Sequence, residues 1–302
     1  MSRVATFSLQ NIVVSSMQQS QQKLAVSQNQ LATGKKAPDF ASLGAGAIPS
    51  LAAHSLLARQ EAQATVRSQI NTKMSIQDSA MNDITATATD LKNQLLTVIG
   101  TGQSDGLQAT IEGAFQQFRW AINMNDGGEA LFGGSQTDSD PFAPQTFDAL
   151  ATTDEADAFR NDQVKVSGHV ADGVDMRFGV LASDIGADIF KAFKTLAQAG
   201  SIGRTPTDDQ KSAIESAITQ IDKGLDRLQG INAENGRKMA QLEELDARAG
   251  ARTVLMQDII SHHEEADLSQ VAIDISQRKT ILEASYSVFS QLSKLGLINY
   301  LN

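Results

Sequence analysis

The stretch LSQVAIDISQRKTILEASYSVFSQLSKLGLINY, residues 268–300, decides how the rest of the chain is interpreted. Its apolar side chains recur every seven residues, which is the spacing that keeps one stripe of a helix against a partner helix. The spacing therefore predicts a long C-terminal helix whose apolar stripe needs a partner. The stripe consists of one row with Leu268, Ile275, Leu282 and Phe289, a second row with Ile281, Val288 and Leu295, and Leu292 between the rows.

A matching stripe lies near the N-terminus. Met17, Leu24 and Leu31 are seven residues apart, and the small side chains of Ser20 and Ser27 between them allow a close approach. We therefore expect the two ends of the chain to pair. The predicted assembly interface consists of Met17, Leu24, Leu31, Leu268, Ile275, Leu282, Phe289, Leu292 and Leu295.

This pairing is expected to be marginal within one subunit. Residues 8–33 are rich in Ser, Gln and Ala, so few large side chains are available for burial. Each of these contributes about 1.5–3 kcal/mol when fully buried, whereas ordering the chain costs about 1–2 kcal/mol per residue. We infer that both ends are frayed in the free subunit and fold when they pair and meet neighbouring copies.

Two interior segments carry longer stripes in which apolar residues are spaced four and three apart in alternation, as in a coiled coil. The sequence therefore predicts a mainly α fold, with a long antiparallel helical coiled coil or bundle formed by both halves of the chain. Two asparagines within the second stripe are interpreted as residues that specify its register. The first stripe is Ile70, Met74, Gln77, Met81, Ile84, Ala88, Leu91, Leu95 and Val98, and the second is Ile214, Ile218, Ile221, Leu225, Leu228, Asn232, Asn235, Met239 and Leu242.

Residues 129–182 have a different character, with Gly and Pro punctuation and partial alternation of apolar and polar residues. This pattern predicts a small β-rich variable domain at the tip of the helical arms. Phe132 and Phe142 are expected to close its core, and the alternative is that they are surface anchors for a neighbouring molecule. The predicted domains are thus a terminal coiled-coil assembly domain (1–40 and 265–302), a helical rod (41–128 and 183–264) and the β-rich insertion (129–182).

Composition narrows the function classes. The formal charge of −10 and the pI near 4.9 argue against nucleic acid and anionic membranes as partners, since both require a basic surface. The chain has no cysteine, which excludes disulfides and thiolate metal sites. The first ten residues lack the apolar run of a secretory signal peptide, and no window reads as a transmembrane helix.

A search for chemistry finds no catalytic, cofactor-binding or metal-binding residues. Nucleophile elbows, phosphate loops and dinucleotide-binding glycine patterns do not occur. His262 and Glu265 share a helical face at a spacing that suits a metal ion, but a third ligand is not identifiable, and a solvated face is the more common explanation. Trp120 lies off the stripe of its own helix, which leaves both an interface role and a core role open.

Residues 28–36, QNQLATGKK, and Asn235-Gly236-Arg237 resemble two stretches of the flagellin superfamily. The first is similar to its Gln-Leu-Ser-Ser/Thr-Gly-Lys-Arg stretch and the second to its Gly-Ala/Asn-Arg region. Residues 131–138, LFGGSQTD, followed by Pro141-Phe142, are similar to the pattern that precedes the variable domain in the family's hook-filament junction branch. The chain as a whole resembles this superfamily, and that branch most.

The resemblance implies a structural, non-enzymatic function: the chain is expected to join hook to filament in the extracellular bacterial flagellum. It implies type III export without a cleaved signal peptide, self-assembly into a helical ring, contacts with a neighbouring hook-associated protein and with flagellin, and an export chaperone at the C-terminal helix. One alternative is a flagellin that forms the filament itself. A second alternative is a surface binding or enzymatic module displayed by the insertion.

Overall fold

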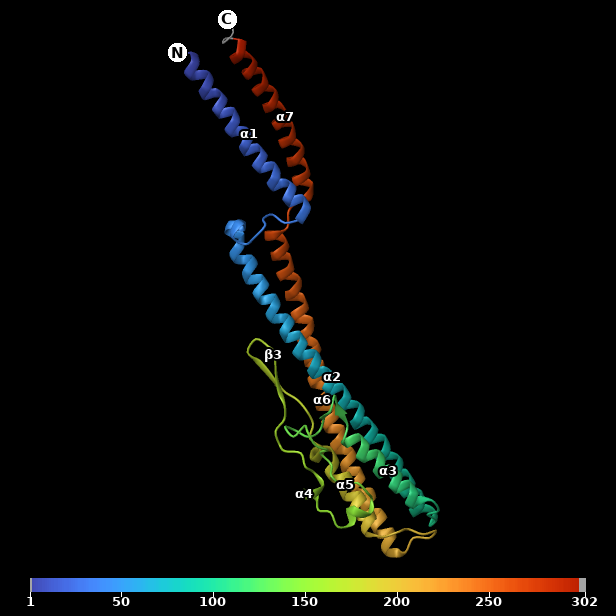
Figure 1. Cartoon of the computed structure of the whole chain (residues 1–302). Coiled ribbons are helices and arrows are strands. Elements are labelled where there is room, and N and C mark those ends of the chain that lie inside the picture. The colour runs from blue at the N-terminus through green and yellow to red at the C-terminus, as the bar shows by residue number, and fades with distance from the viewer. Residues whose placement is uncertain (1, 299–302) are drawn as a thin grey trace. The chain divides into compact units, whose positions relative to one another are not determined.

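The computed structural model describes residues 2–298, and the side chains of residues 11–291. The chain divides into two compact units (Figure 1). We call Met1–Arg59 with Ala251–Asn302 the terminal unit, and Gln60–Gly250 the central unit. Both boundaries fall inside long helices, α2 (Ala47–Thr101) and α6 (Asp208–Glu264). The predicted boundaries, 40/41 and 264/265, follow helix ends and therefore differ from this division.

In the terminal unit, helices α1 (Ser2–Thr33) and α7 (Leu268–Ile298) lie side by side and pack against one another (Figure 1). Gly34 ends α1 in a left-handed conformation, φ 69°, with its amide bonded to the Gln30 carbonyl. Asp267 begins α7, because its carboxylate accepts hydrogen bonds from the amides of Ser269 and Gln270 at 2.9 and 3.1 Å. A short 3₁₀ helix, η1 (Ala41–Gly46), precedes α2.

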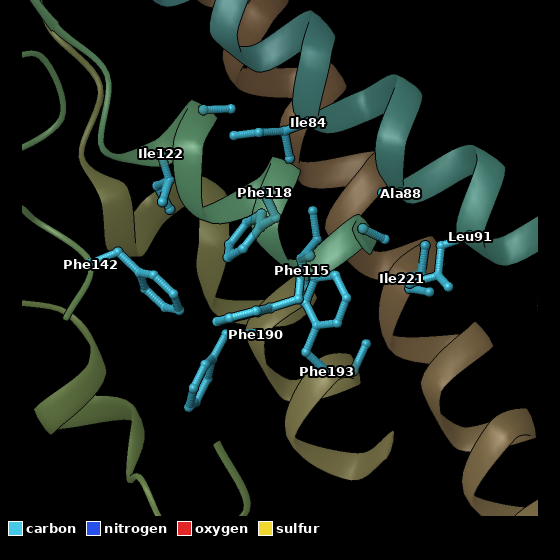
Figure 2. Close-up of a cluster of buried hydrophobic side chains, with 14 of the residues drawn as sticks. Ile84, Ala88, Leu91, Phe115, Phe118, Ile122, Phe142, Phe190, Phe193 and Ile221 are labelled. Atoms are coloured by element: carbon cyan, nitrogen blue, oxygen red, sulfur yellow. The ribbon is translucent and has the colours of Figure 1, made fainter. Parts of the chain in front are cut away.

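The core of the central unit lies where α2 and α6 meet α3 (Leu107–Ile122) and α5 (Ala182–Gln198). All nine residues of the 70–98 stripe are buried, as their spacing predicts. Figure 2 shows Ile84, Ala88 and Leu91 of α2 with Phe115 and Phe118 of α3 and residues of α5 and α6. The phenylalanines pack edge to face or tilted, which adds to the stability gained from their buried area.

The two asparagines of the second stripe bond to the facing helix. Asn235 is buried and donates to the backbone carbonyl of Met74 at 3.0 Å, and Asn232 donates to the side chain of Asn82 at 3.0 Å. A shift in register between α2 and α6 would leave the buried side-chain amide of Asn235 without a hydrogen-bond acceptor, at a cost of about 1–3 kcal/mol. These bonds support the interpretation that the asparagines specify register.

The insertion holds less strand than predicted. Its regular elements are two short antiparallel hairpins and two helical turns, and the remainder is irregular. The hairpins are β1 (Asn125–Asp126) with β2 (Glu129–Ala130), and β3 (Ser167–Ala171) with β4 (Val174–Arg177); the turns are η2 (Asp148–Ala151) and α4 (Glu155–Ala158).

The insertion also does not form the tip of the arms. Val170 and Met176 of its hairpin pack on Ile70, Met74 and Leu242 along α2 and α6. Phe132 and Phe142 are buried in the helical core rather than in a β core of their own. Burial of these two aromatic side chains places the insertion alongside the helices of the central unit. The loops around Ser104 and Gly203 close the end of the arms, where the Ser104 hydroxyl donates to the Gly203 carbonyl at 2.6 Å.

The Gly-Gly turn of the LFGGS motif is held by a carboxylate. Asp162 accepts bonds from the amide and hydroxyl of Ser135 and from the amide of Val164, and these bonds lower the pKa of its carboxyl. A Cβ at Gly134 would lie 2.2 Å from the Asp162 carboxylate, and one at Gly133 would lie 2.1 Å from a backbone oxygen. The backbone contact therefore requires glycine at Gly133, and the positive φ of 70° favours glycine at Gly134.

The fold is mainly α, as predicted. Residues 41–101 form a helical segment long and apolar enough to cross a membrane by length and composition alone. Its most apolar 18-residue window has a mean hydropathy of 1.2 and is 11 % buried. The same test is met by helices of soluble proteins, so the absence of a membrane partner stays a prediction.

Candidate assembly surface

Helices α1 and α7 meet along one stripe each. Leu282 is 6 % exposed and Val271 7 % exposed, while Ile275 and Phe289 are half-buried in the same stripe. On α1, Ser27 is buried, and Met17 and Leu24 are half-buried. The small side chain of Ser27 lets the two helices approach closely.

Other residues of the predicted interface lie elsewhere. Leu31 and Leu268 are about half-exposed. Leu292 and Leu295 lie outside the residues whose side chains are described. Ile281 and Val288 of the second row are likewise about half-exposed. Adjacent residues on a helix point about 100° apart, so a helix that buries Leu282 must turn Ile281 outward.

Sequence reasoning missed Val271. The seven-residue count started from Leu268, whereas the stripe that meets α1 also contains Val271, four residues before Ile275. The same spacing rule had identified the stripes of the central unit, so the signal was present. The assembly role of the nine residues remains a prediction.

A buried carboxylate, Glu264, joins the ends of α1 and α6 to the first turns of α2. It accepts a short hydrogen bond from the Ser50 hydroxyl, and its Oε1 lies 2.7 Å from His54 Nε2. The backbone adds an antiparallel bridge between Lys35 and Glu265. We call Ser50, His54, Glu264 and this bridge the Glu264 clasp.

The backbone bonds of the clasp tie distant parts of the chain together. Lys36 donates its amide to the Glu264 carbonyl at 2.6 Å, and Ala266 donates its amide to the Gly34 carbonyl at 2.8 Å. The ammonium of Lys35 lies 3.9 Å from the carboxylate but is largely exposed, so it contributes little. In the sequence, Glu264 belongs to the polar run His262-His263-Glu264-Glu265. The spacing of apolar residues around this run does not indicate that Glu264 is buried.

The clasp should make the terminal unit sensitive to acid. The Ser50 hydroxyl bond, with a smaller contribution from His54, holds the pKa of Glu264 below its ordinary value of 4.5, against the opposing effect of burial. A lowered pKa stabilises the folded unit at higher pH, and this stabilisation is lost as the pH falls from about 4.5 through the pKa of the folded state.

We therefore expect the amides of Lys36 and Ala266 to lose hydrogen-exchange protection in assembled protein as the pH falls below 4.5. In Glu264→Gln, which keeps the shape but does not titrate, their protection should be lower at neutral pH and change little with acid. Acid loss of equal size in wild type and variant would show that Glu264 is not the responsible group.

In the described part of the chain, no group of three His, Cys, Asp or Glu residues could hold a metal ion. A groove of about 540 Å³ in the central unit is lined by polar and acidic side chains of α2 and α6, including Asp78, Asn82, Asp226 and Asn232. It presents no nucleophile paired with a base. Trp120 is 65 % exposed on α3 and so does not belong to the core.

Charge is distributed unevenly between the units. The terminal unit has nine basic and seven acidic residues, a net charge of +2, whereas the central unit has sixteen basic and twenty-eight acidic residues, a net charge of −12. The acidic character inferred from the whole composition therefore belongs to the central unit alone. The terminal unit is close to neutral.

Exposed apolar residues show the opposite distribution. Of the twenty large apolar side chains that are exposed among residues 11–291, fifteen lie in the terminal unit, which holds just over a third of the chain. Scattered exposed apolar residues are normal on protein surfaces, but a concentration of them marks an interaction site. The terminal unit is therefore the candidate assembly surface.

Comparison with known proteins finds no matching family model. The chain is 24 % identical over 291 residues to flagellar hook-associated protein 3 of Escherichia coli K12, a match that covers 89 % of this chain and 90 % of the relative. It is 23 % identical over 288 residues to the protein of the same name from Salmonella typhimurium, with the same shares covered.

Solved structures show the same fold. A putative flagellar hook-associated protein from Vibrio parahaemolyticus matches with a TM-score of 0.59 and 16 % identity, over 72 % of this chain and 96 % of that one. FlgL from Bacillus cereus matches with a TM-score of 0.57 and 15 % identity, over 68 % of this chain and 97 % of that one.

Proposed function

We propose that this chain is a structural component of the bacterial flagellum, at the junction between hook and filament. The observation that carries the proposal is the match to hook-associated protein 3 along nearly the full length of both chains. A shared domain alone would match over a shorter stretch. The extracellular part of the flagellum is the corresponding location.

The physical character of the two units supports a structural role. The central unit has two buried hydrophobic clusters, the larger of them rich in phenylalanine, whereas most of the exposed large apolar side chains lie in the terminal unit. Such a surface gains stability by contact with other subunits. Self-assembly into a helical ring, with contacts to a neighbouring hook-associated protein and to flagellin, follows as the finer proposal.

Export through the flagellar type III channel fits the same division. The helices α1 and α7 bury few large side chains against each other, so the pair is held together weakly and can pass unfolded. An export chaperone at the C-terminal helix would cover the apolar row of Ile281 and Val288 before assembly. The relatives are structural flagellar proteins, and we propose no enzymatic activity.

Hydrogen exchange on the purified, unassembled chain tests this disorder-to-order mechanism. We expect residues 11–33 and 268–291 to exchange freely and residues 70–98 and 214–242 to be strongly protected, because opening free energies follow buried contacts. Equal protection in all four ranges would contradict folding on assembly.

The competing candidate is a filament-forming flagellin, and growth behaviour separates it from a junction protein. Purified chain added to its own sheared assemblies should form oligomers that stop short. Unlimited growth of long filaments from these seeds would favour flagellin. Restored motility in cells of the source organism that lack the chain would support the flagellar role itself.

A further inference from the structure

The buried side chains of the central unit form two separate hydrophobic clusters. The larger cluster lies where α2 and α6 meet α3 and α5, and the smaller cluster lies where the β3–β4 hairpin covers α2 and α6. Among the described residues, α3 and α5 contribute buried side chains to the larger cluster alone. We call residues 167–178, the hairpin and the residue after it, the strap. The smaller cluster consists of Ile70, Met74, Val170, Met176, Phe178 and Leu242.

A buried polar layer separates the two clusters along α2 and α6. On α2, Gln77 is 3 % exposed and stands between Met74 of the smaller cluster and Ala80 of the larger one. On α6, Asn235 is equally buried and bonds to the Met74 carbonyl. Gln77 Nε2 donates to the Leu131 carbonyl at 2.6 Å, but its buried Oε1 accepts no hydrogen bond from a described residue. Because this layer buries little apolar surface, the two clusters are joined less tightly than the residues within each.

The strap depends on α2 and α6 for its own stability. In the described chain β3 and β4 pair only with each other, and an isolated two-stranded hairpin is at best marginally stable in water. Arg67 of α2 donates its Nη1 to the Val170 carbonyl at 2.8 Å and its Nε to Asp246 of α6. Gln63 donates to the Asp172 carboxylate at 2.9 Å. The strap is therefore bonded to α2 directly and to α6 through the guanidinium.

The same stretch of α2 and α6 depends on the strap in turn. Ile70, Met74 and Leu242 are at most 3 % exposed, and the strap packs on all three. Gly168 lets the strap lie this close, because a Cβ at that position would lie 2.6 Å from Ile70 Cδ1. Loss of the strap would expose this apolar surface to water. Elements that are stable only together are expected to open together.

We propose that the strap and the helical segments beneath it, residues 63–74 and 239–246, open and close as one unit while the larger cluster stays folded. The strap holds the end of the central unit at which α2 and α6 pass the unit boundary. Unfolding that spreads inward along these two helices must release the strap before it reaches the larger cluster. This device belongs to a single chain and does not depend on the proposed flagellar function.

Native-state hydrogen exchange of the full-length chain in low urea tests the proposal with a matched pair of variants. Ile70→Val and Ile84→Val each remove one carbon from a buried isoleucine of α2, the first in the smaller cluster and the second in the larger. Opening of the strap unit breaks the contacts of Ile70 only, whereas complete unfolding breaks those of both residues. Ile70→Val should therefore speed exchange about threefold to tenfold in residues 66–74 and 84–95 alike. Ile84→Val should do so in 84–95 and change exchange in 66–74 less than about twofold.

The wild-type chain should show the same division. Amides of residues 66–74, 168–176 and 239–246 should share one opening free energy, which lies between those of the terminal helices and of residues 84–95. A single opening free energy for all of these central ranges would overturn the proposal. Equal acceleration of residues 66–74 by Ile70→Val and Ile84→Val would overturn it as well.

A reversible lock gives a second test, because the chain contains no cysteine of its own. A Cβ at Gly168 would lie 3.4 Å from Val66 Cγ1, so the sulfurs of Val66→Cys and Gly168→Cys come within bonding range. Oxidation of the two thiols by oxidised glutathione should slow exchange in residues 239–246 of α6 about tenfold or more, and dithiothreitol should reverse the effect. The disulfide joins only α2 and the hairpin, so unchanged exchange in 239–246 would show that the strap does not hold α6 and that the proposal is wrong.

Discussion

Replacing Leu282 by aspartate is expected to abolish assembly while the central unit stays folded. Leu282 is the most buried of the α7 residues in the described stripe that faces α1, at 6 % exposed. A carboxylate there would lose its hydration without gaining a partner, and removal of a buried leucine alone costs about 2–5 kcal/mol. The α1–α7 pair is only marginally stable, so a loss of this much free energy is expected to separate the two helices.

Sedimentation velocity measures the assembly, and urea unfolding followed by circular dichroism measures the central unit. Thr280→Asp, an exposed position two residues away, is the matched control and should assemble like wild type. Assembly of Leu282→Asp at the wild-type concentration would show that the α1–α7 stripe is not part of the interface.

Replacing Asp246 by alanine is expected to destabilise the central unit by about 1–3 kcal/mol, because it removes the half-exposed carboxylate that accepts a hydrogen bond from a buried guanidinium. Arg67 is 2 % exposed, its Nε lies 2.5 Å from Asp246 Oδ1, and its Nη1 donates to the Val170 carbonyl at 2.8 Å. The guanidinium thus ties the β3–β4 hairpin to α2 and α6. Urea unfolding of the full chain gives the change in free energy.

Two further variants establish the cause. Arg67→Met combined with Asp246→Ala removes both charges and should recover part of the loss, which a double-mutant cycle quantifies. Glu244→Ala on the same helix breaks the exposed pair with Arg248 and should cost less than about 1 kcal/mol. Equal losses for Asp246→Ala and Glu244→Ala would refute a special role for burial.

The helical stripes of the central unit were predictable because helix periodicity alone determines which side chains face inward. All of the 70–98 stripe and the row of Leu107, Ile111, Phe115 and Phe118 are buried. The insertion was less predictable. Alternation of apolar and polar residues over a few positions suggested strands. The burial of Phe132 and Phe142 in the helical core could not be predicted, because it depends on contacts with residues far away in the sequence.

The candidate site shows the same limit. Periodicity found Leu282 and Met17, but a seven-residue count placed Leu268 and Leu31 in a stripe that the structure leaves about half-exposed. Glu264 and Arg67 were not predicted because the burial of a charged residue depends on partners distant in sequence. The net charge of each unit, by contrast, can be counted from the sequence once the boundary between the units is known.

The Glu264 clasp has a consequence for the order of folding. Beside the clasp, the ammonium of Lys36 donates to the His262 carbonyl, and this bond joins residues 226 positions apart, so a chain without other structure would have to close a very long loop to form it. The entropy of loop closure rises with the logarithm of loop length, and contacts of such high sequence separation slow folding. Once residues 60–250 have folded, the loop is already shortened and the clasp closes at a much smaller entropic cost. The clasp is therefore expected to form last, so the subunit acquires its terminal unit only after the rest of the chain has folded.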